Sequence, residues 1–172
     1  MGRSSSVPAR IAWAVGLLDV GSDDQILEFG CGPGVAVGLV CDRLEAGRIT
    51  AIDRSSIAVE RTRARNAGHV AAGRAVLQQV DLAGFRGAPR QFDKAFAVNV
   101  NVFWTSIADE ECAVLSRVLR PGGVLRLVYG GPDGARNVGP GVAANLERHG
   151  FTTEATRSPS AGMICVTGRL GP

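Results

Sequence analysis

The feature that most constrains this chain is a group of glycines directly after a short apolar run, in the stretch ILEFGCGPGVAVG, residues 26–38. Gly30, Gly32 and Gly34 alternate with other residues there. Glycine lets a backbone turn sharply and lets a ligand approach it closely, at an entropic cost. A buried strand followed by this turn and by a helix from Val35 would place backbone N–H groups and a helix N-terminus in one crevice. We therefore expect a ligand to bind on this turn.

Short apolar runs alternate with amphipathic stretches along the chain, which favours a mostly parallel sheet with helices between its strands. The last part differs, because FTTEATR and MICVTGRL flank a segment with Pro and Gly and predict a β-hairpin. The expected fold class is α/β, a doubly wound Rossmann-like sheet of seven strands with an antiparallel C-terminal hairpin strand. The five strands before the hairpin are expected at 25–29, 49–52, 75–80, 92–99 and 124–129, and the helices at 11–18, 35–44, 56–67, 107–119 and 142–149.

Two local signals refine these boundaries. Ser106 with Asp109 forms a plausible capping pair for the helix at 107–119. The RPGG segment, residues 120–123, is typical of a helix exit and turn.

The 172 residues fit one domain, 1–172, with a full core. Residues 1–24 are expected to form a helical lid segment within it, together with loops near Phe103 and at 130–139. The sequence has neither an apolar run of the ~20 residues that a membrane span needs nor an export signal. Four scattered cysteines and two histidines do not form a metal-binding pattern. We expect reduced thiols, a cytoplasmic protein and no metal.

The net charge of +3 is small, and it says little about partners. Arg54, Arg61, Arg63 and Arg65 gather around one predicted helix. A nucleic-acid surface normally shows a stronger basic excess, often with exposed aromatics. A solvated helix face is the preferred interpretation, and nucleic-acid binding is a minor alternative. The oligomeric state is open.

Polar residues follow the second and third strands, where ligands of such sheets bind. Asp53 comes directly after an apolar strand, 19 residues beyond Gly34. An acid at this place commonly accepts hydrogen bonds from ribose hydroxyls, although it could also be a helix cap. Asp81 ends the third strand and could meet an adenine amino group, with Leu82 as an apolar neighbour. A plain turn acid is the alternative for Asp81.

The ends of the fourth and fifth strands supply candidates for a reacting centre. Asn99 and Asn101 would lie at the carboxyl end of the central strand. Trp104 either lines a substrate pocket or packs under the next helix, and packing is slightly favoured. Tyr129, the single tyrosine, is a weak candidate for a substrate contact or general base.

In this order the motifs resemble the class I S-adenosylmethionine-dependent methyltransferases. The matching stretches are ILEFGCGPG, ITAIDRS, VD at 80–81, FDKAFAVNVNVFW and LRPGGVLRLVY, from about residue 25 to 129. The resemblance implies S-adenosylmethionine as the cofactor and a methyl acceptor of the small-molecule class. It also implies roles for single residues: Glu28, Gly30, Cys31, Gly32 and Gly34 at the methionine part of the cofactor, Asp53 and Arg54 at the ribose, Asp81 and Leu82 at the adenine, and Asn99 below the sulfonium.

Departures from the family pattern reduce the range of expected methyl acceptors. The string NVNVFW lacks the two prolines of enzymes that methylate nucleic-acid amino groups, and no Pro-Cys pair for C5 chemistry is present. A nicotinamide-dependent oxidoreductase of the same fold is an alternative, disfavoured by Val35 at a glycine position and by the acid Glu28. A non-catalytic cofactor-binding module is the other alternative.

Overall fold

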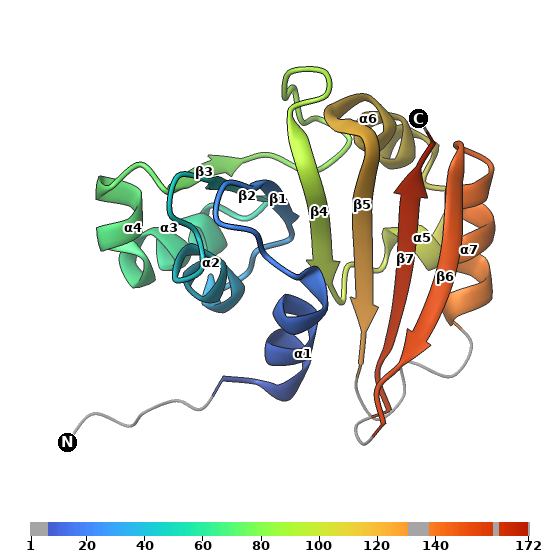
Figure 1. Ribbon diagram of the computed structural model, residues 1–172, viewed down its shortest axis with the longest axis horizontal. Coiled ribbons are helices and arrows are strands. Elements are labelled where there is room, and N and C mark those ends of the chain that lie inside the picture. The colour runs from blue at the N-terminus through green and yellow to red at the C-terminus, as the bar shows by residue number, and fades with distance from the viewer. Residues whose placement is uncertain (1–6, 131–137, 160–161, 172) are drawn as a thin grey trace.

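The strands form where the sequence runs apolar between turn residues, and most of their residues are buried. The computed structural model describes residues 7–130, 138–159 and 162–171 (Figure 1). The strands are β1 Gln25–Phe29, β2 Arg48–Asp53, β3 Ala75–Gln79, β4 Phe92–Val98, β5 Leu119–Tyr129, β6 Phe151–Arg157 and β7 Ile164–Leu170. The helices are α1 Ala9–Leu18, α2 Val35–Cys41, α3 Ser56–Arg65, α4 Ala67–Ala71, α5 Val102–Thr105, α6 Asp109–Val118 and α7 Val138–Glu147.

The seven strands form one sheet in the order β3-β2-β1-β4-β5-β7-β6. Neighbouring strands from β3 to β5 pair in parallel, whereas β7 lies antiparallel to both β5 and β6. The predicted fold class is therefore confirmed. The direction of winding reverses between β1 and β4, and ligands of such sheets bind in the crevice outside the carboxyl ends of these strands.

Helices cover both faces of the sheet, and alternate strand residues face each layer. On one face, buried residues of α6 and α7 join Leu27, Phe29 and Leu127 in a large apolar cluster. On the other face, α1 and α2 pack against residues that include Ile26 and Phe96. In Figure 1, α1 lies at the lower end of β4, while α6 and α5 lie behind the strands β5, β7 and β6 and α7 lies beside β6.

Two local predictions were wrong. Strand β5 already begins at Leu119, so the RPGG segment lies inside a strand instead of forming a separate turn. The reason is that the fully buried Leu119 pairs with Phe92, after which the register shifts. The Ser106–Asp109 capping pair is not formed, because Ala108 takes the N-cap position with φ of +52° and makes no side-chain cap bond. Ser106 instead accepts the N–H of Ala108 at 3.3 Å.

The segments predicted as a lid are only partly described. Residues 1–6 and 131–137 lie outside the described residues. The described helix α1 packs Ala14 against Val128 and Cys165 of the sheet. No helix in the described ranges has both the length and the apolar character needed to cross a bilayer.

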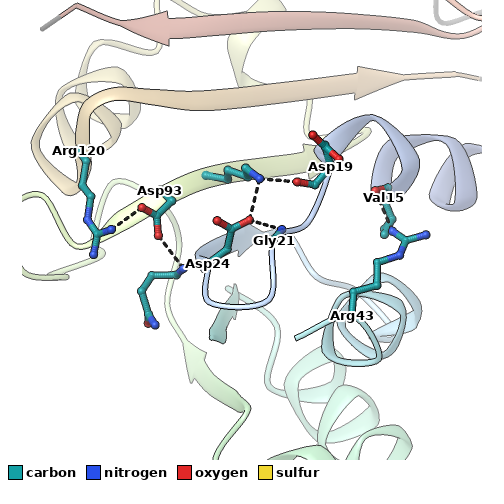
Figure 2. A network of polar contacts seen from close by, with 9 residues as sticks. Val15, Asp19, Gly21, Asp24, Arg43, Asp93 and Arg120 are labelled. Atoms are coloured by element: carbon teal, nitrogen blue, oxygen red, sulfur yellow. Dashed lines mark hydrogen bonds and ion pairs between the residues drawn. The ribbon is translucent and has the colours of Figure 1, made fainter. Parts of the chain in front are cut away.

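A network of polar contacts joins the loop after α1 to the sheet (Figure 2). Lys94, the single lysine of the chain, donates to the carbonyl of Asp19 and, at 2.7 Å, to the Asp24 carboxylate. That carboxylate also accepts the N–H of Gly21 at 2.7 Å. Nearby, Asp93 pairs with Arg120 and accepts the N–H of Gln25 at 2.8 Å. These contacts fix the entry into β1 and hence the start of the glycine turn.

Replacing Lys94 by Met is expected to lower the free energy of unfolding by about 2 kcal/mol, because the largely buried Asp24 carboxylate loses its countercharge. The side chains of this pair are only 20% and 17% exposed. Urea unfolding measures the change. Arg120→Gln is the matched control, since the Arg120–Asp93 pair is more exposed and should be worth less than about 1 kcal/mol. An equal loss of unfolding free energy in the two variants would contradict the larger contribution that we assign to the Lys94–Asp24 pair.

Candidate functional site

The glycine turn after β1 has a backbone that side chains would disfavour. Gly30, Gly32 and Gly34 have φ of +69°, +53° and +73°, a left-handed region that L-residues with a Cβ rarely adopt. A Cβ on Gly30 would lie 2.6 Å from Val100 Cγ2, and one on Gly34 would lie 2.6 Å from Thr62 Cγ2. Gly32 faces open space, with nothing within 4 Å of such an atom. The turn therefore leaves its backbone approachable at Gly32.

The Asp53 carboxylate holds this turn against the end of β2. Its Oδ2 accepts the N–H of Gly32 at 3.0 Å, and its Oδ1 accepts the N–H of Ser55 at 2.9 Å. Thr62 from α3 adds a hydrogen bond from its Oγ1 to the Gly32 carbonyl, at 2.8 Å. The half-buried Asp53 thus has one bond per oxygen, and each carboxylate oxygen can accept a second.

Beside this turn, the carboxyl ends of the strands enclose a cavity of about 630 Å³. Its lining comes from the segments that follow β1, β2, β3 and β4, as the strand order predicts. The lining residues are Phe29, Gly30, Ile52, Asp53, Arg54, Val80, Asp81, Leu82, Val98, Asn99, Val100, Asn101, Val102, Thr105, Ser106 and Glu111.

Glu28 of β1 is a carboxyl group in an apolar setting. It is only 3% exposed, and its Oε2 has no hydrogen-bond partner among the described residues. Burial, with a smaller contribution from the negative Asp53, raises the pKa of Glu28 to about 8. Its neighbours Leu27 and Phe29 face the α6–α7 layer, so by alternation Glu28 points to the α1–α2 side. It lies next to the glycine turn without lining the cavity. A cation that approaches such a carboxyl favours its ionised form and lowers its pKa.

Cys31 and Gly34 are buried in the turn and do not line the cavity. The Cys31 thiol lies 3.6 Å from Thr62 Oγ1, and burial raises its pKa to about 12. A thiol in this state is a small core residue, not a nucleophile.

Asp81 and Leu82 line the cavity as the sequence predicted. Asp81 is exposed, and its Oδ1 accepts the N–H of Gly84 at 2.7 Å, which leaves Oδ2 without a bond in the described residues. Leu82 is buried at 7% exposure. Together they offer an acceptor and an apolar surface to one ligand.

Asn99 has an unusual backbone, with φ of +56°. Its side-chain Oδ1 accepts the N–H of Gly130 at 2.9 Å, and its Nδ2 donates to the Gly130 carbonyl at 3.2 Å. The Asn99 amide thus connects the ends of β4 and β5. Asn99 still lines the cavity, as does Asn101.

Trp104 and Tyr129, the other two substrate candidates, do not line the cavity. Trp104 is 45% exposed, and its Nε1 donates to Asn101 Oδ1 at 3.3 Å. Tyr129 is 3% exposed and its hydroxyl donates to the Val100 carbonyl at 3.0 Å. Burial raises the pKa of Tyr129 above its ordinary value. The tyrosine therefore supports the cavity wall and is poorly suited to act as a base.

Several residues of the site were not predicted from the sequence. Thr105, Ser106 and Glu111 line the cavity because the chain turns through the short helix α5 before it enters α6. The sequence places Glu111 only within the helix predicted at 107–119. Thr105 and Ser106 could have been found from their position in the loop after β4, because every residue of such a loop can contact a ligand. Glu111 lies in α6, and no sequence pattern pointed to it.

Comparisons with known proteins agree with this geometry. A family model described as a methyltransferase domain matches residues 26–123. An uncharacterized 37.1 kDa protein in transposon TN4556 of Streptomyces fradiae is 32% identical over 119 residues, which cover 67% of this chain and 32% of that protein. The chain spans about a third of the length of the curated relatives it matches.

Solved structures agree with the fold. A SAM-dependent methyltransferase from Aquifex aeolicus matches with a TM-score of 0.75 at 15% identity, covering 93% of this chain and 89% of that one. A SAM-dependent O-methyltransferase from Thermotoga maritima matches with a TM-score of 0.76 at 14% identity, covering 96% and 66%. Since the family model spans more than half of the chain and the fold is the same, this chain belongs to the methyltransferase domain family.

Proposed function

We propose that this protein is an S-adenosylmethionine-dependent methyltransferase acting on a small-molecule acceptor. The observation that carries the proposal is the pair of acids at the glycine turn. The buried Oε2 of Glu28 has no hydrogen-bond partner among the described residues, and Asp53 is bonded to Gly32. A ligand with phosphates would be repelled by the Asp53 carboxylate at the turn, and it would offer the buried Glu28 no countercharge. A ligand with an ammonium and a sulfonium would be attracted. Family membership gives the proposal its reaction class.

The described residues fit this cofactor at three places. Asp53 keeps acceptor capacity on both oxygens for the two ribose hydroxyls. Asp81 presents a free Oδ2, with the apolar Leu82 beside it, for an aromatic amine such as adenine. The left-handed Gly32 leaves open space where a side chain would block the methionine part. We assign Glu28, Gly30, Cys31, Gly32, Gly34, Asp53, Arg54, Asp81, Leu82 and Asn99 to the cofactor site on this basis, with Cys31 and Gly34 acting through the shape of the turn.

When bound, S-adenosylmethionine supplies a methyl group on a positively charged sulfur. The chain has to align the acceptor and exclude water, and alignment can lower a barrier by ~7–11 kcal/mol in favourable cases. The segment from Asn99 to Ser106 supplies one wall for this purpose. Asn101 is one of several exposed polar residues of that wall and is our candidate for an acceptor contact. Trp104, bonded to Asn101, lies at the same segment.

The two competing functions differ in what the cavity binds. A nicotinamide-dependent oxidoreductase would bind NAD, and a non-catalytic module would bind the sulfur cofactors without transferring a methyl group. Calorimetric titration with S-adenosylmethionine, its demethylated product S-adenosylhomocysteine and NAD distinguishes a methyltransferase from an oxidoreductase by which of these ligands binds. Transfer of a labelled methyl group from the cofactor to a panel of small acceptors separates the second.

Asp53→Asn is expected to weaken binding of S-adenosylhomocysteine by about 10- to 100-fold, because an amide accepts fewer hydrogen bonds than a carboxylate and replaces an acceptor by a donor. Calorimetry gives the dissociation constants. Asp42→Asn is the control, an exposed acid at the end of α2 that does not line the cavity. Unchanged affinity in Asp53→Asn, or tight binding of NAD alone, would refute the proposed function.

The raised pKa of Glu28 predicts a pH dependence. The pKa of Glu28 is about 8 in the folded state against an ordinary 4.5, so the folded protein holds this proton more tightly than the unfolded chain. Its contribution to stability is therefore complete below pH 4.5 and is lost as the pH rises to about 8. Glu28→Gln should remove this loss and melt at a higher temperature than the wild type at pH 8.5. Thermal unfolding of the ligand-free protein across this range measures it.

The same variant should bind the cofactor more weakly. The wild-type affinity for S-adenosylhomocysteine, whose ammonium is positive, should rise between pH 6 and 8 as Glu28 ionises, while the affinity of Glu28→Gln stays flat. Glu60→Gln, which changes an exposed acid on α3, serves as the control. If the two variants show the same pH profile, Glu28 does not face the ligand's charge.

A further inference from the structure

One wall of the cavity is a short segment with little regular secondary structure. Residues 99–106 include helix α5, which is a single turn of four residues. An isolated turn is unstable because few hydrogen bonds offset the ordering of its backbone, and the carbonyls at its end lack helical partners. Yet Val102, Thr105 and Ser106 from this segment line the cavity. The turn is closed by hydrogen bonds from the N–H groups of Trp104, Thr105 and Ser106 to carbonyls within the segment. Its position in the cavity wall depends in addition on contacts with other elements.

Asn145 of α7 supplies the strongest external contacts to this wall. Its side-chain Nδ2 donates to the carbonyl of Phe103 at 2.8 Å and to the carbonyl of Ser106 at 2.9 Å. Both hydrogens of the amide are thus used by the end of α5. Its Oδ1 accepts a hydrogen bond from Arg148, which fixes the orientation of the amide.

The position of Asn145 argues for a specific requirement. The side chain is 7% exposed on a helix whose buried neighbours Val142 and Leu146 are apolar. Burying an amide costs free energy unless its hydrogen bonds are formed, so an apolar residue would suit the core at least as well. Because the amide bonds only to the wall and to Arg148, its role is to satisfy the wall's carbonyls.

Two further contacts hold the same segment from other elements. Tyr129 of β5 donates its hydroxyl to the Val100 carbonyl, at 3.0 Å. Phe103 is fully buried with its ring centroid 5.9 Å from that of Phe29. The wall is thus attached to β1, β5 and α7, and Asn145 is the attachment nearest to the cavity-lining residues Thr105 and Ser106.

We propose that Asn145 is a positioning residue of the cofactor cavity: it sets the conformation of residues 101–107 and thereby the affinity for the cofactor. The part of this inference that concerns affinity rests on the proposed function. The part that concerns the wall does not require any ligand. The hydrogen bonds of Asn145 to the wall go to backbone carbonyls, so it acts through the backbone of the wall.

The test compares Asn145→Leu and the nearly isosteric Asn145→Asp, neither of which can donate two hydrogen bonds at neutral pH, with a matched control. Ser116→Ala removes the bond from Ser116 Oγ to the His149 carbonyl at 3.2 Å, which also joins α6 to the end of α7 but does not involve the wall. Hydrogen–deuterium exchange reports the opening of residues 101–107. Acrylamide quenching of Trp104, in a Trp13→Phe background, reports the same wall by fluorescence.

Both Asn145 variants should increase amide exchange in residues 101–107 by at least tenfold relative to the global rate and should make Trp104 more accessible to quencher. Both should also raise the dissociation constant of S-adenosylhomocysteine about tenfold. Ser116→Ala should change none of these quantities, even where it lowers the melting temperature as much. A structural role alone would change stability in all three variants without the selective effect on the wall.

The outcomes separate the two proposals. Wall exchange and quenching that match the wild type in a folded Asn145 variant would overturn the inference. An altered wall with unchanged affinity would overturn the link to the ligand. Failure of the wild type to bind S-adenosylhomocysteine would count against the proposed function alone, since exchange and fluorescence still decide the role of Asn145. If Asn145→Leu does not fold, Asn145→Asp and the exchange of residues 101–107 carry the test.

Discussion

The hydrogen bond between the Asp53 carboxylate and the N–H of Gly32 is the contact on which the site depends. It joins the end of β2 to the turn after β1, and parallel pairing of these strands places the two ends at the same edge. Together with the hydrogen bonds from the N–H groups of Gly30 and Cys31 to the Ile52 carbonyl, it fixes a turn whose glycines restrict the backbone least. Thr62 of α3 and Asn66, the residue directly after α3, complete the restraint through the Gly32 and Gly34 carbonyls, at 2.8 and 3.0 Å. The hydrogen bonds of Asp53 and Thr62 to the backbone of Gly32 thus keep the opposite side of this glycine open.

The opposite wall of the cavity is restrained by a different half of the molecule. The glycine turn is fixed by β2 and α3. The hydrogen bonds that fix residues 99–106 come from β5 and α7, and the Phe103–Phe29 ring contact adds β1. The two groups of restraints belong to the two sides of the switch point between β1 and β4. A cavity whose walls are attached to separate halves of one sheet keeps its width only as long as the sheet keeps its pairing. The pair of β1 with β4 therefore couples the two walls mechanically.

The sequence predicted what depends on short-range pattern. The strands, the hairpin and the residues directly after β2 and β3 follow from apolar runs, turn residues and the rule that ligands bind at carboxyl ends. The errors arise where distant contacts override local preference. RPGG lies in a strand because Leu119 pairs with Phe92, and the predicted cap at Ser106 is replaced by a left-handed Ala108. The hydrogen-bond partners of Tyr129 and Asn145 could not be predicted, because Val100 and Phe103 lie 29 and 42 residues away from them in the chain. How the candidate residues act on a ligand is still a prediction.

Electrostatics explain why a turn of this shape need not bind phosphate. The N–H groups of a glycine turn and a helix N-terminus ordinarily favour an anion. Here the Asp53 carboxylate already accepts the N–H of Gly32, so part of that positive potential is used inside the protein. The buried Glu28 beneath the turn is pushed toward its neutral form by burial and by Asp53. A cation at the turn would reverse this, because it lowers the cost of ionising Glu28 and in return is held by the charge it creates. Binding of a cation and loss of the proton from Glu28 therefore favour each other. This coupling favours a positively charged ligand over a dinucleotide on the same backbone.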